Sequence, residues 1–291
     1  MRERKITLTA GEFHLREWGE SGAPKLLMLH GFPEYSGAWR EVAERLADRY
    51  HCIAPDQRGY GQSPAPADPQ AYKAAHLVGD LAELIAALGG GPIIVVGHDW
   101  GAAAAYALAI SNPQLVEKLI ILNGVHPAPF QKAIAAGGAQ CAASQYINYL
   151  RRPDAEARLS KDDFKGLAGL FAEHMDMSWM TPERAAQYRR EWAREGRLSG
   201  MLNWYRASKI HVGPVGEVWR DLPDMPPDRL RVRMAHLLIW GAGDTALLPE
   251  ATEGLEAYCD DLTRVEIAGA DHWIAHQKPD EVAGAIRDWL A

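Results

Sequence analysis

Apolar and polar residues alternate through residues 5–19, a pattern typical of a hairpin at the edge of a sheet. Apolar runs without polar interruption follow, and such runs are typical of strands that are buried on both faces. They begin within residues 25–33, 51–63, 92–97 and 116–124. Amphipathic helical periodicity lies between them at residues 39–50 and 76–90. This alternation predicts an α/β fold with a doubly wound, mostly parallel sheet.

The strand rhythm stops near residue 127. From residue 131 to about residue 228 the chain shows helix-like stretches rich in Arg, Trp, Tyr and Met, and it closes with the proline-rich segment DLPDMPPDRL, which is typical of a linker. Strand patterns resume in AHLLIWGAGD and TRVEIAGADHW, and a helix pattern ends the chain. We therefore expect a core formed by residues 1–130 and 229–291, interrupted by a helical insertion at residues 131–228.

The composition is that of an ordinary globular protein, because 47% of the 291 residues are hydrophobic. A net charge of −7 argues against binding to nucleic acid or to an anionic membrane. The three cysteines are far apart and no metal-ligand spacing occurs, so neither a disulfide framework nor a metal site is expected. The sequence shows no apolar leader and no long apolar span. We expect a cytoplasmic protein without membrane contact, and a homodimer is compatible with the sequence.

The segment VVGHDWGAAAAYALA places an ionisable residue between a buried strand and an alanine-rich helix. Gly97-His98-Asp99-Trp100-Gly101 matches the pattern of a nucleophile elbow, in which glycines allow a strained turn and close approach of neighbouring backbone. The helix N-terminus favours an ionised Asp99, and the backbone N–H of Trp100 is placed to serve an oxyanion hole. The alternative is that Asp99 simply caps an ordinary helix.

A nucleophile needs a base, and the base needs an orienting acid. Asp244 follows a buried strand and His272 follows the next one, in the chain order nucleophile, acid, histidine. Asp271 is a rival for the acid and His276 a weaker rival for the base. The loop "LHGFP" ends another strand, where the N–H of Phe32 would supply the second donor of the oxyanion hole.

These motifs resemble the epoxide hydrolases of the α/β-hydrolase fold over nearly the whole chain. The resemblance rests on HGFP at residues 30–33, DQRGYGQS at residues 56–63, GHDWGA at residues 97–102, Asp244 and His272. It implies an aspartate nucleophile on Asp99, a cap domain formed by residues 131–228 and no cofactor. The implied reaction converts an epoxide and water to a vicinal diol through an ester on Asp99 that is hydrolysed by water activated by His272.

Epoxide hydrolases carry two cap tyrosines, and a neutral tyrosine is a suitable acid for an alkoxide leaving group. The segment GMLNWYRAS resembles the second tyrosine motif of the family and assigns that role to Tyr205. The segment SQYINYLRRP resembles the first motif. Its proline, Pro153, favours Tyr146, with Tyr149 as the rival. Each tyrosine has an alternative interpretation as a core aromatic residue.

Three other functions remain open on the sequence. In a haloalkane dehalogenase the Trp100 indole would bind halide, but the second donor often found at the position of Phe32 is missing. A haloacetate dehalogenase would place arginines near the nucleophile, where this chain has Trp100, Ala103 and Ala104. A ligand-binding protein without catalysis would not need a complete set of nucleophile, acid and base.

Several other residues are given structural interpretations. His98 is expected to pack under the elbow and His30 to support the oxyanion loop. Glu34 is left outside the catalytic set, either near the hydrolytic water or at the cleft rim. Trp179 and Trp204 are expected either to line an apolar pocket or to bind the insertion to the core.

Overall fold

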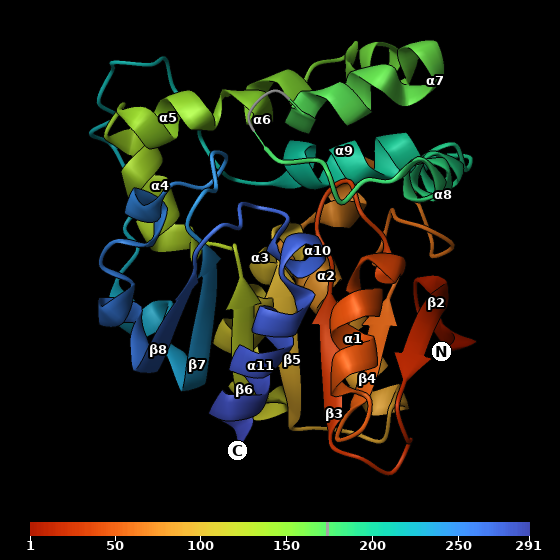
Figure 1. Ribbon diagram of the computed structural model, residues 1–291. Coiled ribbons are helices and arrows are strands. Elements are labelled where there is room, and N and C mark those ends of the chain that lie inside the picture. The colour runs from red at the N-terminus through yellow and green to blue at the C-terminus, as the bar shows by residue number, and fades with distance from the viewer. Residues whose placement is uncertain (173–174) are drawn as a thin grey trace.

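One sheet of eight strands runs through the computed structural model, which describes residues 1–172 and 175–291 (Figure 1). The strand order is β1-β2-β4-β3-β5-β6-β7-β8. Only β2 pairs antiparallel with its neighbours among these strands, and the other adjacent pairs are parallel. The strands are β1 (Arg2–Leu8), β2 (Gly11–Trp18), β3 (Lys25–Leu29), β4 (His51–Pro55), β5 (Ile93–His98), β6 (Val116–Leu122), β7 (Val232–Gly241) and β8 (Cys259–Ile267). The predicted mostly parallel sheet and its edge hairpin are confirmed.

Helices cover both faces of the sheet, as the uninterrupted apolar strands predict. One face carries α1 (Arg40–Leu46), α10 (Ile274–Gln277) and α11 (Pro279–Leu290), and the other carries α2 (Ala74–Ala87) and α3 (Trp100–Ser111) (Figure 1). Strand β5 shows why both faces need to be covered. Alternate side chains of a strand point to opposite faces, and in β5 the side chains on both faces are apolar. Ile93 and Val95 belong to the core under α2 and α3, whereas Ile94 and Val96 belong to the core under α1 and α11.

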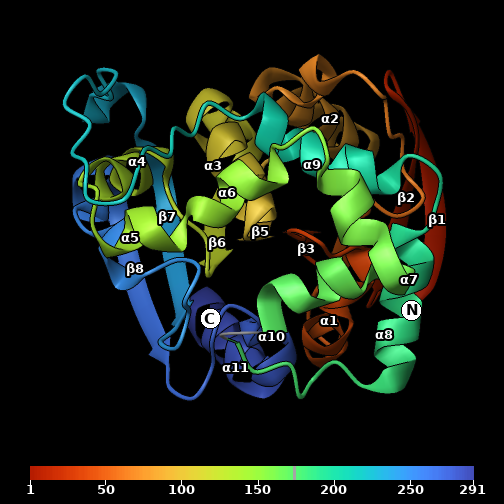
Figure 2. The same ribbon diagram turned by 90° about the horizontal axis from the view of Figure 1, so that it is seen from above.

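The segment between β6 and β7 is helical and lies above the carboxyl ends of the strands (Figure 1). Its helices, called the inserted helices below, are α4 (Pro127–Ala135), α5 (Ala139–Ala143), α6 (Gln145–Leu150), α7 (Ala155–Ala172), α8 (Pro182–Trp192) and α9 (Arg197–Ala207). Seen from above, α6 to α9 are arranged around the ends of β3, β5 and β6 (Figure 2). Helix α4 begins at Pro127 and crosses position 131, where the sequence predicts the insertion to begin.

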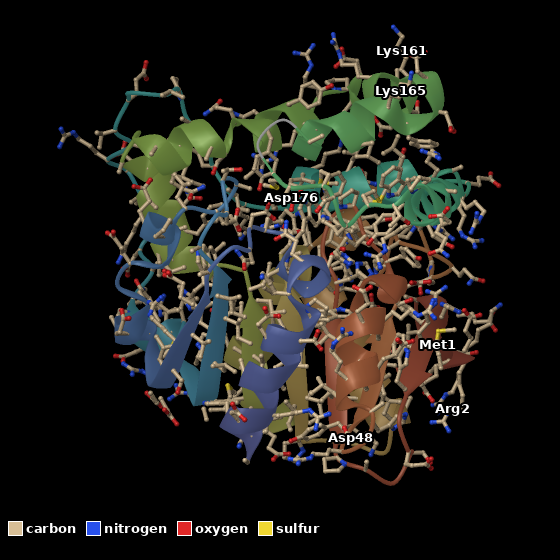
Figure 3. The ribbon with its side chains drawn as sticks, in the orientation of Figure 1. Met1, Arg2, Asp48, Lys161, Lys165 and Asp176 are labelled. Atoms are coloured by element: carbon tan, nitrogen blue, oxygen red, sulfur yellow. The ribbon has the colours of Figure 1, made fainter. Side chains whose placement is uncertain are left out.

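Helix α7 is interrupted near its middle. Asp162, Asp163 and Phe164 have positive φ values of 51°, 56° and 63°, so the chain makes a left-handed turn between two helical halves. Lys161 and Lys165 flank this turn and point away from the sheet (Figure 3). The break therefore lies on the outer side of the inserted helices, away from the strand ends.

Direct hydrogen bonds tie the inserted helices to the sheet. The Trp192 indole donates to the carbonyl oxygen of Pro33 at 2.6 Å, and the Arg184 guanidinium pairs with Glu41 at 2.8 Å. Asp176 lies between the two layers (Figure 3), and its backbone N–H donates to a carboxylate oxygen of Asp271 at 2.7 Å. The apolar side chains of these helices also join the core under α2 and α3, so the two layers share one core.

Candidate active site

Asp99 lies at the sharp turn between β5 and α3, at the carboxyl edge of the sheet. Its φ of 49° and ψ of −119° form a conformation that residues other than glycine seldom adopt. Neighbouring glycines permit this turn. A Cβ on Gly97 would lie 2.7 Å from the carbonyl oxygen of Gly101, and a Cβ on Gly101 would collide with the backbone of Leu29. This is the strand-turn-helix geometry of a nucleophile elbow.

The loop after β3 supplies a backbone donor to Asp99. The N–H of Phe32 donates to Asp99 Oδ1 at 2.7 Å. Gly31 permits this approach, since a Cβ there would collide with the Asp99 side chain. The His30 ring hydrogen-bonds to the carbonyl of Gly31 at 3.0 Å, consistent with its expected support of the loop. Trp100 is the first residue of α3, where a backbone N–H has no acceptor within the helix. Of the two predicted oxyanion donors, the Phe32 N–H contacts Asp99 directly, and the Trp100 N–H belongs to the next residue of the chain, at the start of α3.

His272 lies between two carboxylates. Its Nδ1 is 2.8 Å from Asp244 Oδ2, within hydrogen-bond distance, and its Nε2 is 3.7 Å from Asp99 Oδ2. The side chain of His272 is 4% exposed and that of Asp244 is 0% exposed, whereas that of Asp99 is 12% exposed. The most exposed side chain of the three is thus that of Asp99, the predicted nucleophile.

Asp271 and His276, the alternatives for the acid and the base, make their hydrogen bonds outside this group of three residues. The Asp271 carboxylate accepts the backbone N–H of Trp273 at 2.9 Å and that of Asp176 at 2.7 Å, so it holds the loop and the inserted helices together. His276 Nε2 lies 2.6 Å from Glu34 Oε1. The structure therefore brings together Asp99, Asp244 and His272, the three residues that the sequence favours for these roles.

The carboxylates of Asp99 and Asp244 and the imidazole of His272 stabilise one another's charged forms. Burial lowers the pKa of His272, but the charge and hydrogen bond of Asp244 and the charge of Asp99 outweigh it and raise the pKa to about 9. Burial raises the pKa of Asp244, but the charge and hydrogen bond of His272 outweigh it and hold that pKa below its ordinary value. Removing the charge of Asp99 would remove one cause of the raised pKa of His272.

Asn123 orients the acid, and sequence analysis missed it. Its side-chain amide donates to Asp244 Oδ2 at 2.8 Å, while its side-chain oxygen accepts the backbone N–H of Gly241 at 2.7 Å. The backbone N–H groups of Ala246 and Leu247 each donate to Asp244 Oδ1 at 2.9 Å. The carboxylate is thus fixed from both sides. The available signal was a polar residue directly after a buried strand, at the edge where ligands bind.

A cavity opens above Asp99 and His272. Its walls come from Phe32 below and from the inserted helices above, and they are mainly apolar and aromatic. The remaining lining residues are Ala143, Tyr146, Leu170, Met175, Tyr205, Thr245 and Ala246. This lining suits a small uncharged molecule.

Tyr146 and Tyr205 both line this cavity, with ring centroids 6.1 Å apart. Burial and the nearby charge of Asp99 raise the pKa of each hydroxyl above its ordinary value, so both tyrosines stay protonated. The rival Tyr149 lies on the same helix as Tyr146 but is not among the residues that line the cavity. The geometry therefore favours Tyr146 for the first tyrosine role.

Glu34 is the centre of a second buried cluster that the sequence did not reveal. Its carboxylate lies 3.2 Å from His98 Nδ1 and 2.6 Å from His276 Nε2, and it accepts the Tyr188 hydroxyl at 3.1 Å. His98 Nε2 also bonds to the backbone carbonyl of His272 at 2.8 Å. These contacts connect α8 and the elbow to the histidine loop, which agrees with a structural role for His98.

Trp179 and Trp204 both make contacts between the insertion and the core. The Trp204 indole donates to the carbonyl oxygen of Arg58 at 2.8 Å. Trp179 stacks on the His276 ring with centroids 3.9 Å apart and an interplanar angle of 4°. These contacts fit the attachment of the insertion to the core, and Trp179 also lines an apolar cavity with Leu167 and Met177, so both interpretations left open by the sequence fit Trp179.

Residues 1–172 and 175–291, which the structure describes, contain no group of three or more His, Cys, Asp or Glu residues that could hold a metal ion. Within the same ranges, no helix is long and apolar enough to cross a membrane. Cys52, Cys141 and Cys259 are free and buried.

A family model described as alpha/beta hydrolase fold matches residues 24–279. The chain belongs to this family. The AB hydrolase superfamily protein YfhM of Bacillus subtilis is 33% identical over 95% of this chain and 93% of its own length. Human Epoxide hydrolase 4 is 33% identical over 96% of this chain and 75% of its own length.

A solved structure from work on novel epoxide hydrolases in metagenomes from hot environments has a TM-score of 0.90 and 38% identity to this chain. It is matched over 98% of its length and covers 100% of this alpha/beta hydrolase. The similarities place the chain among the epoxide hydrolases of the family, so the fold class and the resemblance predicted from the sequence are confirmed.

Proposed function

We propose that this chain hydrolyses epoxides to vicinal diols through a covalent ester on Asp99. The observation that carries the proposal is that one cavity brings together a carboxylate, a histidine and two buried tyrosine hydroxyls. The names of the similar proteins support epoxide hydrolysis as the reaction class. The roles of the individual residues rest on the site geometry.

In the first step, Asp99 Oδ2 attacks one carbon of the epoxide. The carbon–oxygen bond of the ring breaks, and its electron pair passes to the epoxide oxygen, which takes a proton from Tyr146 or Tyr205. Phe32 holds Oδ1 by its N–H, which leaves Oδ2 free to attack. Hydroxyls with raised pKa values donate hydrogen bonds without losing their protons before ring opening.

In the second step, His272 takes a proton from water, and the resulting hydroxide adds to the ester carbonyl carbon. The N–H groups of Phe32 and Trp100 stabilise the oxyanion of the tetrahedral intermediate. Its collapse breaks the acyl–oxygen bond, and the leaving alkoxide takes the proton held by His272 to complete the diol. The carboxylic acid left on Asp99 gives its proton, through water, to the tyrosinate, which restores the site. Because esterification removes the charge of Asp99, the pKa of His272 falls and its neutral form becomes available as the base.

The surroundings of Trp100 favour an epoxide over a halide. Its indole ring packs edge-on against Tyr205 with centroids 5.0 Å apart, and Trp100 is not among the residues that line the cavity above Asp99. An indole outside the cavity lining does not face a leaving halide. Residues 131–228 would act as the cap that delivers the tyrosines and closes the cavity over Asp99.

The function is tested by offering purified protein styrene oxide, 1-chlorobutane and chloroacetate, with diol and halide both quantified. Diol from styrene oxide, absent in Asp99→Asn, supports the proposal. Halide from either chlorinated compound, without diol, would instead establish a dehalogenase. No turnover of the three compounds would favour the non-catalytic binding protein.

The tyrosine roles predict a selective defect in ring opening. Tyr146→Phe and Tyr205→Phe should each slow ester formation about 100-fold, because the phenyl ring fills the same space but cannot donate a proton. The rate constant is measured by rapid quench and intact-protein mass spectrometry. Tyr149→Phe is the matched control and should change it less than about twofold. A large effect of Tyr149→Phe with none of Tyr146→Phe would transfer the first role to Tyr149.

A further inference from the structure

Arg151 joins the two helices that carry the cavity tyrosines. It follows the last residue of α6, the helix that begins at Gln145 and contains Tyr146. Its half-buried side chain reaches across to the end of α9, the helix that contains Tyr205.

The contacts of Arg151 converge on the backbone around Tyr205. Its Nε donates to the carbonyl oxygen of Tyr205 itself at 2.9 Å. Its Nη2 donates to the Ser208 hydroxyl at 2.7 Å, to the Ile210 carbonyl at 2.8 Å and to the Ser208 carbonyl at 3.3 Å. The last carbonyls of a helix lack partners within the helix, and a guanidinium offers several donors in a rigid plane. Arg151 thus fixes both the end of α9 and the turn that follows it.

The neighbouring arginines have different partners. Arg152 is exposed and pairs with Asp154 two residues further along the chain at 2.8 Å. Arg206 pairs with Glu156 of α7 at 2.6 Å and also donates to the carbonyl oxygen of Arg152, two residues after α6, at 3.1 Å. Of these three guanidinium groups, the one that contacts the backbone of Tyr205 is Arg151.

We propose that Arg151 is a positioning residue that sets the distance between the Tyr146 and Tyr205 hydroxyls for ring opening. The proposal rests on the proposed function, because it gives both tyrosines the role of acid. Two acids can bind one epoxide oxygen only if their helices keep a fixed spacing, and small misplacements of catalytic groups are costly. Arg151 is not among the residues that line the cavity, so it sets that spacing without touching the substrate.

The test is a double-mutant cycle of Arg151→Ala and Tyr205→Phe, with Arg152→Ala as the matched control. The rate constants of ester formation and ester hydrolysis are measured separately with styrene oxide by rapid quench and intact mass. Arg151→Ala should slow ester formation about tenfold. Ester hydrolysis, in which the tyrosines take no part as acids, should stay within about twofold. Arg152→Ala should leave both steps unchanged.

The double variant separates positioning from a general structural role. If Arg151 acts through Tyr205, the double variant forms ester within about twofold of Tyr205→Phe alone. The proposal would be overturned if the effects of the two substitutions on ester formation multiplied in the double variant. It would also be overturned if Arg151→Ala slowed ester formation and ester hydrolysis equally. Arg151→Lys keeps the charge but loses the planar array of donors, and should slow ester formation about threefold with the same non-additivity. This variant carries the test if Arg151→Ala lowers the folded fraction in a thermal melt.

The positioning role of Arg151 and the acid role of Tyr205 can be disproved separately. If Tyr205→Phe slows ester formation and Arg151→Ala does not, the positioning role is wrong and the proposed function stands. If Tyr205→Phe leaves ester formation unchanged, the acid assignment is wrong, and the role of Arg151 falls with it.

Discussion

The Asp99→Ala protein should form diol at a rate reduced by about 10⁴-fold or more, because the reaction loses the atom that attacks the epoxide. The other parts of the site cannot replace it. Phe32 donates an N–H, and His272 lies 3.7 Å behind the missing carboxylate in a buried position. Diol formation is measured by chromatography against the unmodified protein at equal folded concentration.

A second variant separates loss of the nucleophile from loss of the fold. Asp99→Asn keeps the shape of the side chain at the strained turn, and its thermal unfolding should stay close to that of the unmodified protein. Neither variant should gain mass when incubated with styrene oxide, because no ester can form. A mass gain in Asp99→Ala would mean that another side chain is alkylated and that Asp99 is not the nucleophile.

The parts of this site that the sequence predicts are those in which local backbone geometry restricts the residue type. Gly97 and Gly101 must be small because backbone from other segments passes within contact distance of them. The turn that they permit therefore leaves a local pattern around Asp99. The buried strands can also be predicted from the sequence, because burial on both faces requires uninterrupted apolar residues such as Ile93 to Val96.

Contacts between distant segments left no such pattern. Glu34 meets His276 across 242 positions of sequence and Tyr188 across 154 positions, and each residue is unremarkable in its own segment. Tyr146 and Tyr149 differ by less than one helical turn, so only the position of the cavity distinguishes them. The register of such pairs depends on how the inserted helices pack, and packing is a property of the whole fold.

His272→Gln should form the ester once and then stall, so that the intact protein gains the full mass of one epoxide. Glutamine cannot take a proton from water, whereas Asp99 keeps its carboxylate and the Phe32 donor. Steady-state diol formation should fall about 10³-fold or more. The mass gain identifies the chemistry as well as the base. Opening of an epoxide retains its oxygen in the ester, whereas displacement of a halide would add the substrate without its halogen.

His276→Gln is the matched control, because it removes a buried histidine that was the rival for the base. Its imidazole faces Glu34 at 2.6 Å, and it stacks on Trp179 rather than on the nucleophile. This variant should turn over without accumulating ester, even if the loss of its hydrogen bond lowers stability. Accumulated ester in His276→Gln, together with normal turnover in His272→Gln, would exchange the two roles. The decisive comparison adds Asp99→Ala to the His272→Gln protein. If the mass gain then disappears, ester formation is assigned to Asp99 and ester hydrolysis to His272.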